Sequence, residues 1–309
     1  MSVSVTAEAI SEGQATREAA AEDAPAWLAW ALDQAPERTF FEHQGAQLEL
    51  LVWGPAGAPG ILLLHGFRAH AHWWSHIAPF LAGEFRVAAL SWSGMGGSEW
   101  REDYSLTLYV DEAMAAASAA GLFDAEVAPI VIAHSLGGHV AALMAADAGE
   151  RFGGMVLVDA TVGPRPPNPP PDPPRRTYPT AAEAAARFRF SPAQPSDPHV
   201  TRWIAEHAVA ETTKADGSTG WSWCFDPHIS SKLERPHAWM RLPLAKCRLA
   251  FVRGEDSLLV TERLEARQRE QAPPGSSFVA IPRAGHHVLA DQPLSLVTAL
   301  RTILAFWRQ

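Results

Sequence analysis

The stretch Val131-Ile132-Ala133-His134-Ser135-Leu136-Gly137-Gly138 decides how this chain folds. Its short, branched, apolar start predicts a buried strand, and the Ala-rich segment after the two glycines predicts a helix. The small residues Ala133 and Gly137 lie two positions before and after the serine, which permits a turn tight enough to strain it. Such a turn sets Ser135 at a helix N-terminus with its hydroxyl above the sheet. We therefore treat Ser135 as a candidate nucleophile and the Leu136 N–H as a candidate donor to a developing oxyanion.

Apolar runs of strand length recur on both sides of this turn, at spacings that leave room for helices. The predicted strands are Thr39–His43, Ala46–Trp53, Ile61–Leu64, Phe85–Ser91, Pro129–Ala133, Met155–Val158, Cys247–Val252 and Ser276–Ile281. Unbroken apolar runs indicate strands that are covered on both faces. Helices are predicted at Leu106–Ala120, Ser135–Ala148 and Leu294–Trp307. The alternation predicts an α/β fold with a mostly parallel eight-stranded sheet and helices on both faces.

One segment interrupts this alternation. Residues 163–176 read GPRPPNPPPDPPRR, with eight prolines in fourteen residues. Proline lacks the N–H that a helix or a central strand needs, so an exposed, stiff connector is expected. We predict a flexible tail at 1–24, a core at 25–160 and 243–309, and between them a helical cap, or lid, at 161–242 after the sixth strand. Helices are expected within the cap at Ala181–Arg189 and Thr201–Val209.

Composition narrows the function classes. The 309 residues carry a net charge of -9, and the 25 Lys and Arg are scattered, which argues against nucleic acid or an anionic membrane as partner. No apolar run approaches the ~20 residues of a membrane span, and the N-terminus lacks the pattern of a secretory signal. Cys224 and Cys247 have no zinc-ligand spacing. A cytoplasmic protein with a small-molecule substrate is expected, and the oligomeric state stays open.

Two further motifs carry chemistry. The run Leu62-Leu63-Leu64-His65-Gly66-Phe67 ends a predicted strand, and Gly66 permits a close turn that makes the Phe67 N–H a second candidate oxyanion donor. We expect His65 to hold this loop by hydrogen bonds. Near the C-terminus, Gly285-His286-His287 follows the last predicted strand. We choose His286, beside the glycine, as the general base, because a serine followed late in the chain by a histidine is the order found in hydrolases.

These landmarks resemble those of the α/β-hydrolase fold, from about Phe41 to the C-terminus. The His65-Gly66 loop, the Ser135 turn and Gly285-His286 match the family's landmarks in order. The run from Ser91 to Ser98 is also similar to the family's loop D-x-x-G-x-G-x-S, but Ser91 stands at the usually acidic position. The resemblance implies a Ser–His–acid triad and no cofactor.

Two carboxylates compete for the place of the acid that the resemblance implies. The usual family position is the third residue after a glycine that follows the seventh strand. Here that residue is Ser257, and Asp256 lies one position short. A second position, used by some members, follows the sixth strand, where this chain has Asp159. An isolated carboxylate at the end of a buried strand is costly unless it is paired. We favour Asp159 as the partner of His286, with Asp256 as the alternative.

The expected reaction is hydrolysis of an ester or related acyl bond through an acyl-enzyme, without metal or cofactor. A metal site at His70, His72 and His76 is disfavoured because no carboxylate or Cys accompanies them. Substrate contacts are expected from His134, Trp73, Trp92, Trp221 and Trp223, which suggests an apolar or aromatic substrate. Three alternatives stay open: a carbon–carbon bond hydrolase, a cofactor-free lyase or oxygenase with a His–Asp dyad, and a non-catalytic member of the fold that binds a small ligand.

Overall fold

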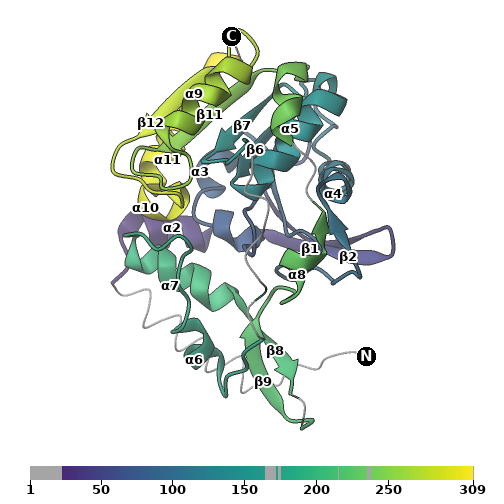
Figure 1. Ribbon diagram of the computed structural model, residues 1–309, viewed down its shortest axis with the longest axis vertical. Coiled ribbons are helices and arrows are strands. Elements are labelled where there is room, and N and C mark those ends of the chain that lie inside the picture. Colours follow the sequence, from purple (N-terminus) through teal and green to yellow (C-terminus); the bar gives the residue numbers. More distant parts are fainter. Residues whose placement is uncertain (1–22, 164–171, 173–174, 215, 235–237, 309) are drawn as a thin grey trace.

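The computed structural model describes residues 23–163, 172, 175–214, 216–234 and 238–308. Eight strands form one sheet in the order β1-β2-β4-β3-β6-β7-β11-β12 (Figure 1). They are β1 (Glu37–His43), β2 (Ala46–Trp53), β3 (Gly60–Leu64), β4 (Arg86–Leu90), β6 (Ile130–His134), β7 (Gly154–Val158), β11 (Leu249–Gly254) and β12 (Ser277–Ile281). The pairs β1–β2 and β2–β4 are antiparallel, and the remaining neighbours are parallel. The predicted sheet is therefore confirmed, each strand within two residues of its expected place.

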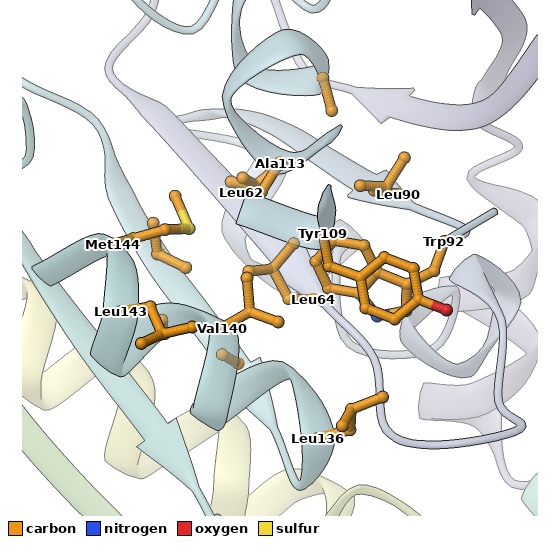
Figure 2. Packing of buried hydrophobic residues seen from close by; sticks show 14 of the residues in the cluster. Leu62, Leu64, Leu90, Trp92, Tyr109, Ala113, Leu136, Val140, Leu143 and Met144 are labelled. Carbon is orange, nitrogen blue, oxygen red and sulfur yellow. The ribbon is translucent and has the colours of Figure 1, made fainter. Parts of the chain in front are cut away.

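Helices cover both faces of the sheet. The core helices are α2 (Ala26–Asp33), α3 (Pro79–Ala82), α4 (Leu106–Ala119), α5 (Leu136–Ala148), α9 (Glu262–Gln271), α10 (Val288–Asp291) and α11 (Pro293–Trp307), with short helices η1 (Ala71–Trp74) and η2 (Gly149–Arg151). Side chains alternate across each strand, so Leu62 and Leu64 pack with α4 and α5 while Leu63 packs with α2 and α11. Figure 2 shows the first cluster, in which Trp92 and Tyr109 lie beside Leu64. Two apolar layers thus hold the sheet and fix where its strands end.

Most of the segment between β7 and β11 lies beyond the carboxyl ends of the central strands, whereas its last residues before β11 pack along α5 (Figure 1). It contains α6 (Ala181–Ala185), α7 (Pro198–His207), β8 (Val209–Thr213), β9 (Thr219–Trp223), α8 (Ile229–Lys232), β10 (Leu233–Glu234) and η3 (Ala238–Leu244), and β10 pairs with β5 (Tyr104–Ser105) of the core. We call its described residues the cap. The expectation of a helical cap was incomplete, because β8 and β9 form an antiparallel hairpin. Residues from Val209 continue as a strand because their backbone pairs with β9.

The predicted N-terminal tail and most of the proline-rich connector lie outside the described residues. Within the connector Asp172 is described, and its carboxylate accepts hydrogen bonds from Arg68 Nη2 at 3.2 Å and from the Ser230 N–H at 2.9 Å. This contact ties the connector to the loop after β3. Among the described helices, none combines the length and apolar character needed to cross a membrane.

Candidate active site

Ser135 lies in a strained turn between β6 and α5. Its backbone has φ 51° and ψ -111°, a conformation that costs a non-glycine residue about 1–3 kcal/mol. The turn is tight because α5 starts against the sheet: a Cβ added to Gly137 would lie 2.8 Å from the Leu64 carbonyl oxygen. One added to Gly138 would lie 2.2 Å from the Ala160 Cβ. The two glycines are therefore required by close packing. The conformation of the turn places the serine above the end of the strand.

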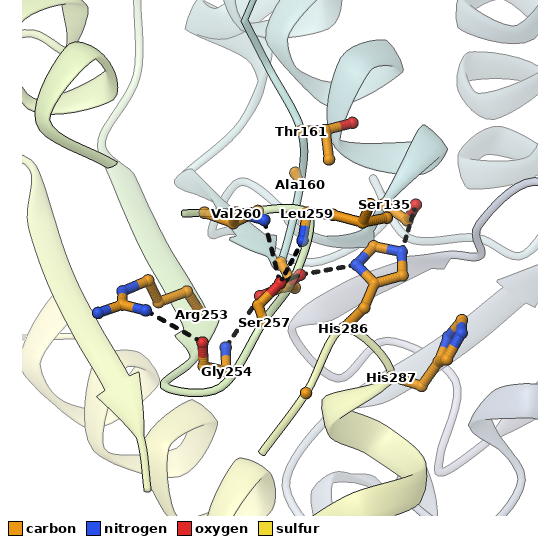
Figure 3. A network of polar contacts seen from close by, with 12 residues as sticks. Ser135, Ala160, Thr161, Arg253, Gly254, Ser257, Leu259, Val260, His286 and His287 are labelled. Carbon is orange, nitrogen blue, oxygen red and sulfur yellow. Dashed lines mark hydrogen bonds and ion pairs between the residues drawn. The ribbon is translucent and has the colours of Figure 1, made fainter. Parts of the chain in front are cut away.

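Three side chains from distant parts of the sequence form a hydrogen-bonded chain at this edge (Figure 3). His286 Nε2 lies 3.0 Å from Ser135 Oγ, and His286 Nδ1 lies 2.6 Å from Asp159 Oδ2. An acceptor carboxylate at Nδ1 selects the tautomer whose Nε2 is free to accept the serine proton. The imidazole and the carboxylate are buried, at 3% and 1% exposure. Such an arrangement can draw a proton from the serine hydroxyl.

The Asp159 carboxylate receives three hydrogen bonds. Besides His286, the Gly254 N–H donates to Oδ1 at 2.9 Å and Ser257 Oγ donates to Oδ2 at 2.7 Å. These donors offset the cost of burying the charge. Asp256, in contrast, is exposed, and its backbone N–H donates to the Ala284 carbonyl at 2.8 Å. Of the two predicted acids, the structure brings Asp159 to the imidazole.

Ser257 is a site residue that sequence reasoning missed. It occupies the third position after Gly254, where the family resemblance leads one to look for the acid. In this chain the position supplies a hydroxyl to the carboxylate at the end of the neighbouring strand instead. Its oxygen also accepts the N–H groups of Leu259 and Val260, at 3.2 and 3.0 Å, which fixes its direction. The sequence did contain a signal for this residue, because a polar side chain occupies the position, three residues after Gly254, where an acid is usual.

The loop after β3 passes directly beside the serine. A Cβ added to Gly66 would lie 3.1 Å from the Ser135 Cβ. His65 holds this loop, because its Nδ1–H donates to the Gly66 carbonyl at 2.7 Å and its Nε2 accepts the Trp92 N–H at 3.2 Å. Burial lowers the pKa of His65 to about 4, so the ring is neutral. The candidate oxyanion donors thus come from Phe67, next along this loop, and from Leu136, the first residue of α5, whose N–H lacks an intrahelical acceptor.

His134 is buried at 1% exposure and does not form a free pocket wall, contrary to expectation. Its Nε2 lies 3.0 Å from the His286 carbonyl oxygen and donates to it when the ring is neutral. Burial, reinforced by His286 and His287, lowers the pKa of His134 well below its ordinary value. His134 therefore braces the backbone of His286, and Trp73 stacks on it with ring centres 6.3 Å apart.

Asp291 is a second residue whose role the sequence did not reveal. It holds the loop that carries His286. Its Oδ2 accepts the Gly285 N–H at 2.7 Å and also bonds to the Gln194 side chain of the cap. Burial raises the pKa of this carboxyl to about 6. Its role could not be seen in the sequence, because it depends on α10 folding back onto the loop that precedes it.

The family's missing structural carboxylate is supplied from another strand. Glu49 of β2 is buried, accepts a hydrogen bond from Ser91 Oγ at 2.7 Å, and accepts the Gly97 N–H at 2.9 Å. Arg38 pairs with its other oxygen at 2.8 Å. This loop therefore has a buried carboxylate partner, Glu49, although position 91 is a serine.

The predicted aromatic contacts divide into two groups. Trp92 was expected to line the site but is fully buried, stacked on Tyr109 at 4.9 Å, because it belongs to the core under α4. Trp73 does reach the site, with its ring 5.5 Å from that of His287 and 5.5 Å from that of Phe190.

The two cap tryptophans, Trp221 and Trp223, contact other cap residues. Trp223 lies near Phe188, with ring centres 6.4 Å apart. Trp221 lies on the same face of β9, and its backbone bridges to Tyr178.

Metal ligation is possible at a place other than the one considered from sequence. Among the described residues, His134, His286 and His287 each offer a ligand atom within 4.8 Å of the others. His76 instead uses Nε2 to contact the Leu289 carbonyl at 2.7 Å. A cation at the three-histidine group would engage His286 itself and so compete with its contacts to Ser135 and Asp159.

Comparison with known proteins decides the family. The model described as "Alpha/beta hydrolase family" matches residues 61–300, well over half of the chain. The chain belongs to the α/β-hydrolase family. The resemblance found in the sequence is thereby confirmed, and hydrolase activity follows at the level of the family.

Individual relatives point in the same direction. This α/β hydrolase is 26% identical over 275 residues to esterase Rv0045c of Mycobacterium tuberculosis, covering 84% of this chain and 87% of the esterase. The crystal structure of that esterase matches with a TM-score of 0.68, covering 91% of this chain and 97% of the other. A thioesterase domain from the curacin biosynthetic pathway matches with a TM-score of 0.71 at 21% identity, covering 86% and 98%. At that identity the thioesterase likeness concerns the fold alone.

Proposed function

We propose that this α/β hydrolase is a serine esterase that cleaves small apolar or aromatic esters through an acyl-enzyme. The observation that carries the proposal is the hydrogen-bonded chain from Ser135 through His286 to Asp159. The esterase relative, similar over most of both chains, supports the choice of an ester bond.

The proposed reaction has two halves. His286 Nε2 takes the proton of Ser135 Oγ as that oxygen attacks the ester carbonyl, and Asp159 stabilises the imidazolium. The Phe67 and Leu136 N–H groups donate to the oxyanion of the tetrahedral intermediate. His286 returns the proton to the leaving alcohol, and the C–O bond breaks. Water, deprotonated by His286, then attacks the acyl-enzyme and releases the acid together with the serine hydroxyl.

The apolar character of the substrate rests on the aromatic side chains near the histidines. Trp73, Phe188 and Phe190 contact one another, with ring centres 5.0–6.4 Å apart. Rings of this kind bury large apolar areas and fit the acyl or aryl part of an ester.

The test compares Ser135→Ala with Ser118→Ala, an exposed serine on α4. Both are assayed on 4-nitrophenyl esters of graded chain length, aryl esters and lactones. We expect Ser135→Ala to lower kcat by a factor on the order of 10⁴–10⁶, since members of such a triad act as a unit. Ser118→Ala should match the wild type. Substantial ester turnover by Ser135→Ala, with none by His286→Ala, would instead indicate that His286 and Asp159 activate water directly, without an acyl-enzyme on Ser135.

A further inference from the structure

A second feature of the molecule lies in the cap. A cavity of about 550 Å³ is lined by Arg175, Arg176, Arg187, Tyr178, Trp223 and Phe225, among others. Its volume is within the range of about 300–1,000 Å³ that is usual for small-ligand sites. It combines aromatic rings with guanidinium groups, a pairing suited to a ligand that has both an apolar and an anionic part.

The charge of this cavity is opposite to that of the chain. The protein as a whole carries a net charge of -9, yet among the residues that the structure describes the charged ones lining the cavity are three arginines. Two arginines that are largely buried pair with acids, Arg68 with Asp172 and Arg101 with Glu112, whereas the three cavity arginines are exposed.

None of the three cavity arginines forms an ion pair with a residue that the structure describes. Arg175 is held in place by a hydrogen bond to Thr212 Oγ1 at 2.8 Å and by stacking over Trp100. Their guanidinium groups therefore stay available for a carboxylate or phosphate.

Two independent contact routes connect the cavity to the candidate active site. The first runs from His134 to Trp73, then to Phe188 at 6.4 Å, and from Phe188 to Trp223 of the cavity wall at 6.4 Å. Arg187 is the residue immediately before Phe188.

The second route starts at the loop after β3. The guanidinium of Arg68, next to Phe67, lies 5.1 Å from the ring centre of Phe67 and 5.1 Å from that of Phe225 in the cavity wall. Both routes therefore connect the wall of the cavity to residues that lie next to the candidate active site.

We propose that the cavity binds an anionic group, a carboxylate or phosphate, on the part of the substrate remote from the scissile ester. The arginines hold this group while the aromatic rings contact the apolar body between it and the carbonyl. This inference rests on the proposed esterase function. It narrows the substrate class from apolar esters to esters that end in a negative charge.

The experiment uses pairs of esters that differ only in charge. One pair is 4-nitrophenyl hydrogen suberate and its methyl ester, and the other is 4-butyryloxyphenyl phosphate and its dimethyl ester. The measured quantity is the ratio of kcat/KM for the anionic ester to that for its neutral partner. The wild type should favour at least one anionic ester, and which pair shows the preference separates a carboxylate from a phosphate.

Variants then assign the preference to the cavity. Arg176→Ala and Arg187→Ala should each lower the ratio about tenfold, the loss expected for one charge-assisted hydrogen bond. Arg189→Ala is the matched control, because it removes the same charge from the same exposed segment but does not line the cavity. A ratio that does not change in Arg176→Ala and Arg187→Ala, or that changes equally in Arg189→Ala, would overturn the proposal.

A binding measurement separates this proposal from the proposed function. The Ser135→Ala protein should bind the intact anionic ester more tightly than its neutral partner in calorimetry. Adding Arg187→Ala should remove the difference. If no ester is cleaved by the wild type, the esterase function fails, and the calorimetry still decides whether the cavity selects an anion. Equal binding of the two esters would contradict the proposal even if ester hydrolysis is confirmed.

Discussion

Charged groups are arranged in opposite ways at the carboxyl ends of the central strands, which we call the edge, and in the cap. At the edge, Asp159 is buried and receives three hydrogen bonds, one of them from a histidine. In the cap, Arg176 and Arg187 are exposed and have no acid partner among the described residues. In our proposal the first arrangement holds a fixed geometry for proton transfer, and the second leaves positive charge for an anionic ligand. We infer that substitutions at the edge change the rate of the chemistry, whereas substitutions in the cap change which ester is used.

The largest expected effect lies at the edge. Asp159→Asn should lower kcat by a factor on the order of 10³–10⁴, because an amide at this position no longer favours the imidazole tautomer that accepts the serine proton. Asp256→Asn should leave kcat unchanged, since this side chain is exposed. Steady-state kinetics on one neutral ester checks both variants. A larger loss in Asp256→Asn would reverse the assignment of the acid.

The next largest effect is on the pH dependence of the free energy of unfolding, which we expect to depend on buried histidines outside the cap. Burial lowers the pKa of His65 and His76 to about 4 and that of His287 to about 3, against an ordinary value of 6.5. Between these values the unfolded chain binds protons that the folded chain does not. The contribution of these histidines is therefore complete above pH 6.5 and falls as the pH drops towards 4, by at most about 1.4 kcal/mol per pH unit for each histidine. Asp291, whose pKa is raised to about 6 in the folded chain, opposes this slope below that pH.

Urea unfolding at a series of pH values between 7.5 and 4.5 measures this slope. His65→Asn should make the slope shallower, because one buried titrating group is removed. His228→Asn is the control from the cap, where the histidine is exposed. Equal slopes in the two variants would show that His65 does not contribute in this way.

The parts of the molecule that sequence predicted are those set by local pattern. Strands such as Ile61–Leu64 are continuous apolar runs. A run of this kind predicts a central strand that is covered on both faces of the sheet. Ser135 and His286 could be proposed as partners because a tight turn and a Gly-His pair are each visible within a few residues, and the structure places the two side chains 3.0 Å apart. The position of the sheet edge then follows from the strand ends.

What sequence could not decide depends on contacts between distant segments. The choice between Asp159 and Asp256 turns on which strand end faces the imidazole. Glu49 serves a loop more than forty residues away, through its bond to Ser91. The Trp92 ring was expected at the site because its loop is near, but the side chain turns into the core.

The central claim is that Ser135 is a nucleophile activated by His286, and covalent labelling tests it most directly. The protein is treated with a fluorophosphonate, digested, and analysed by mass spectrometry for the modified residue. We predict one label per chain, on Ser135, with none in Ser135→Ala and a strongly slowed reaction in His286→Ala. An unlabelled Ser135 in the folded wild-type protein, or equal labelling in His286→Ala, would contradict the account.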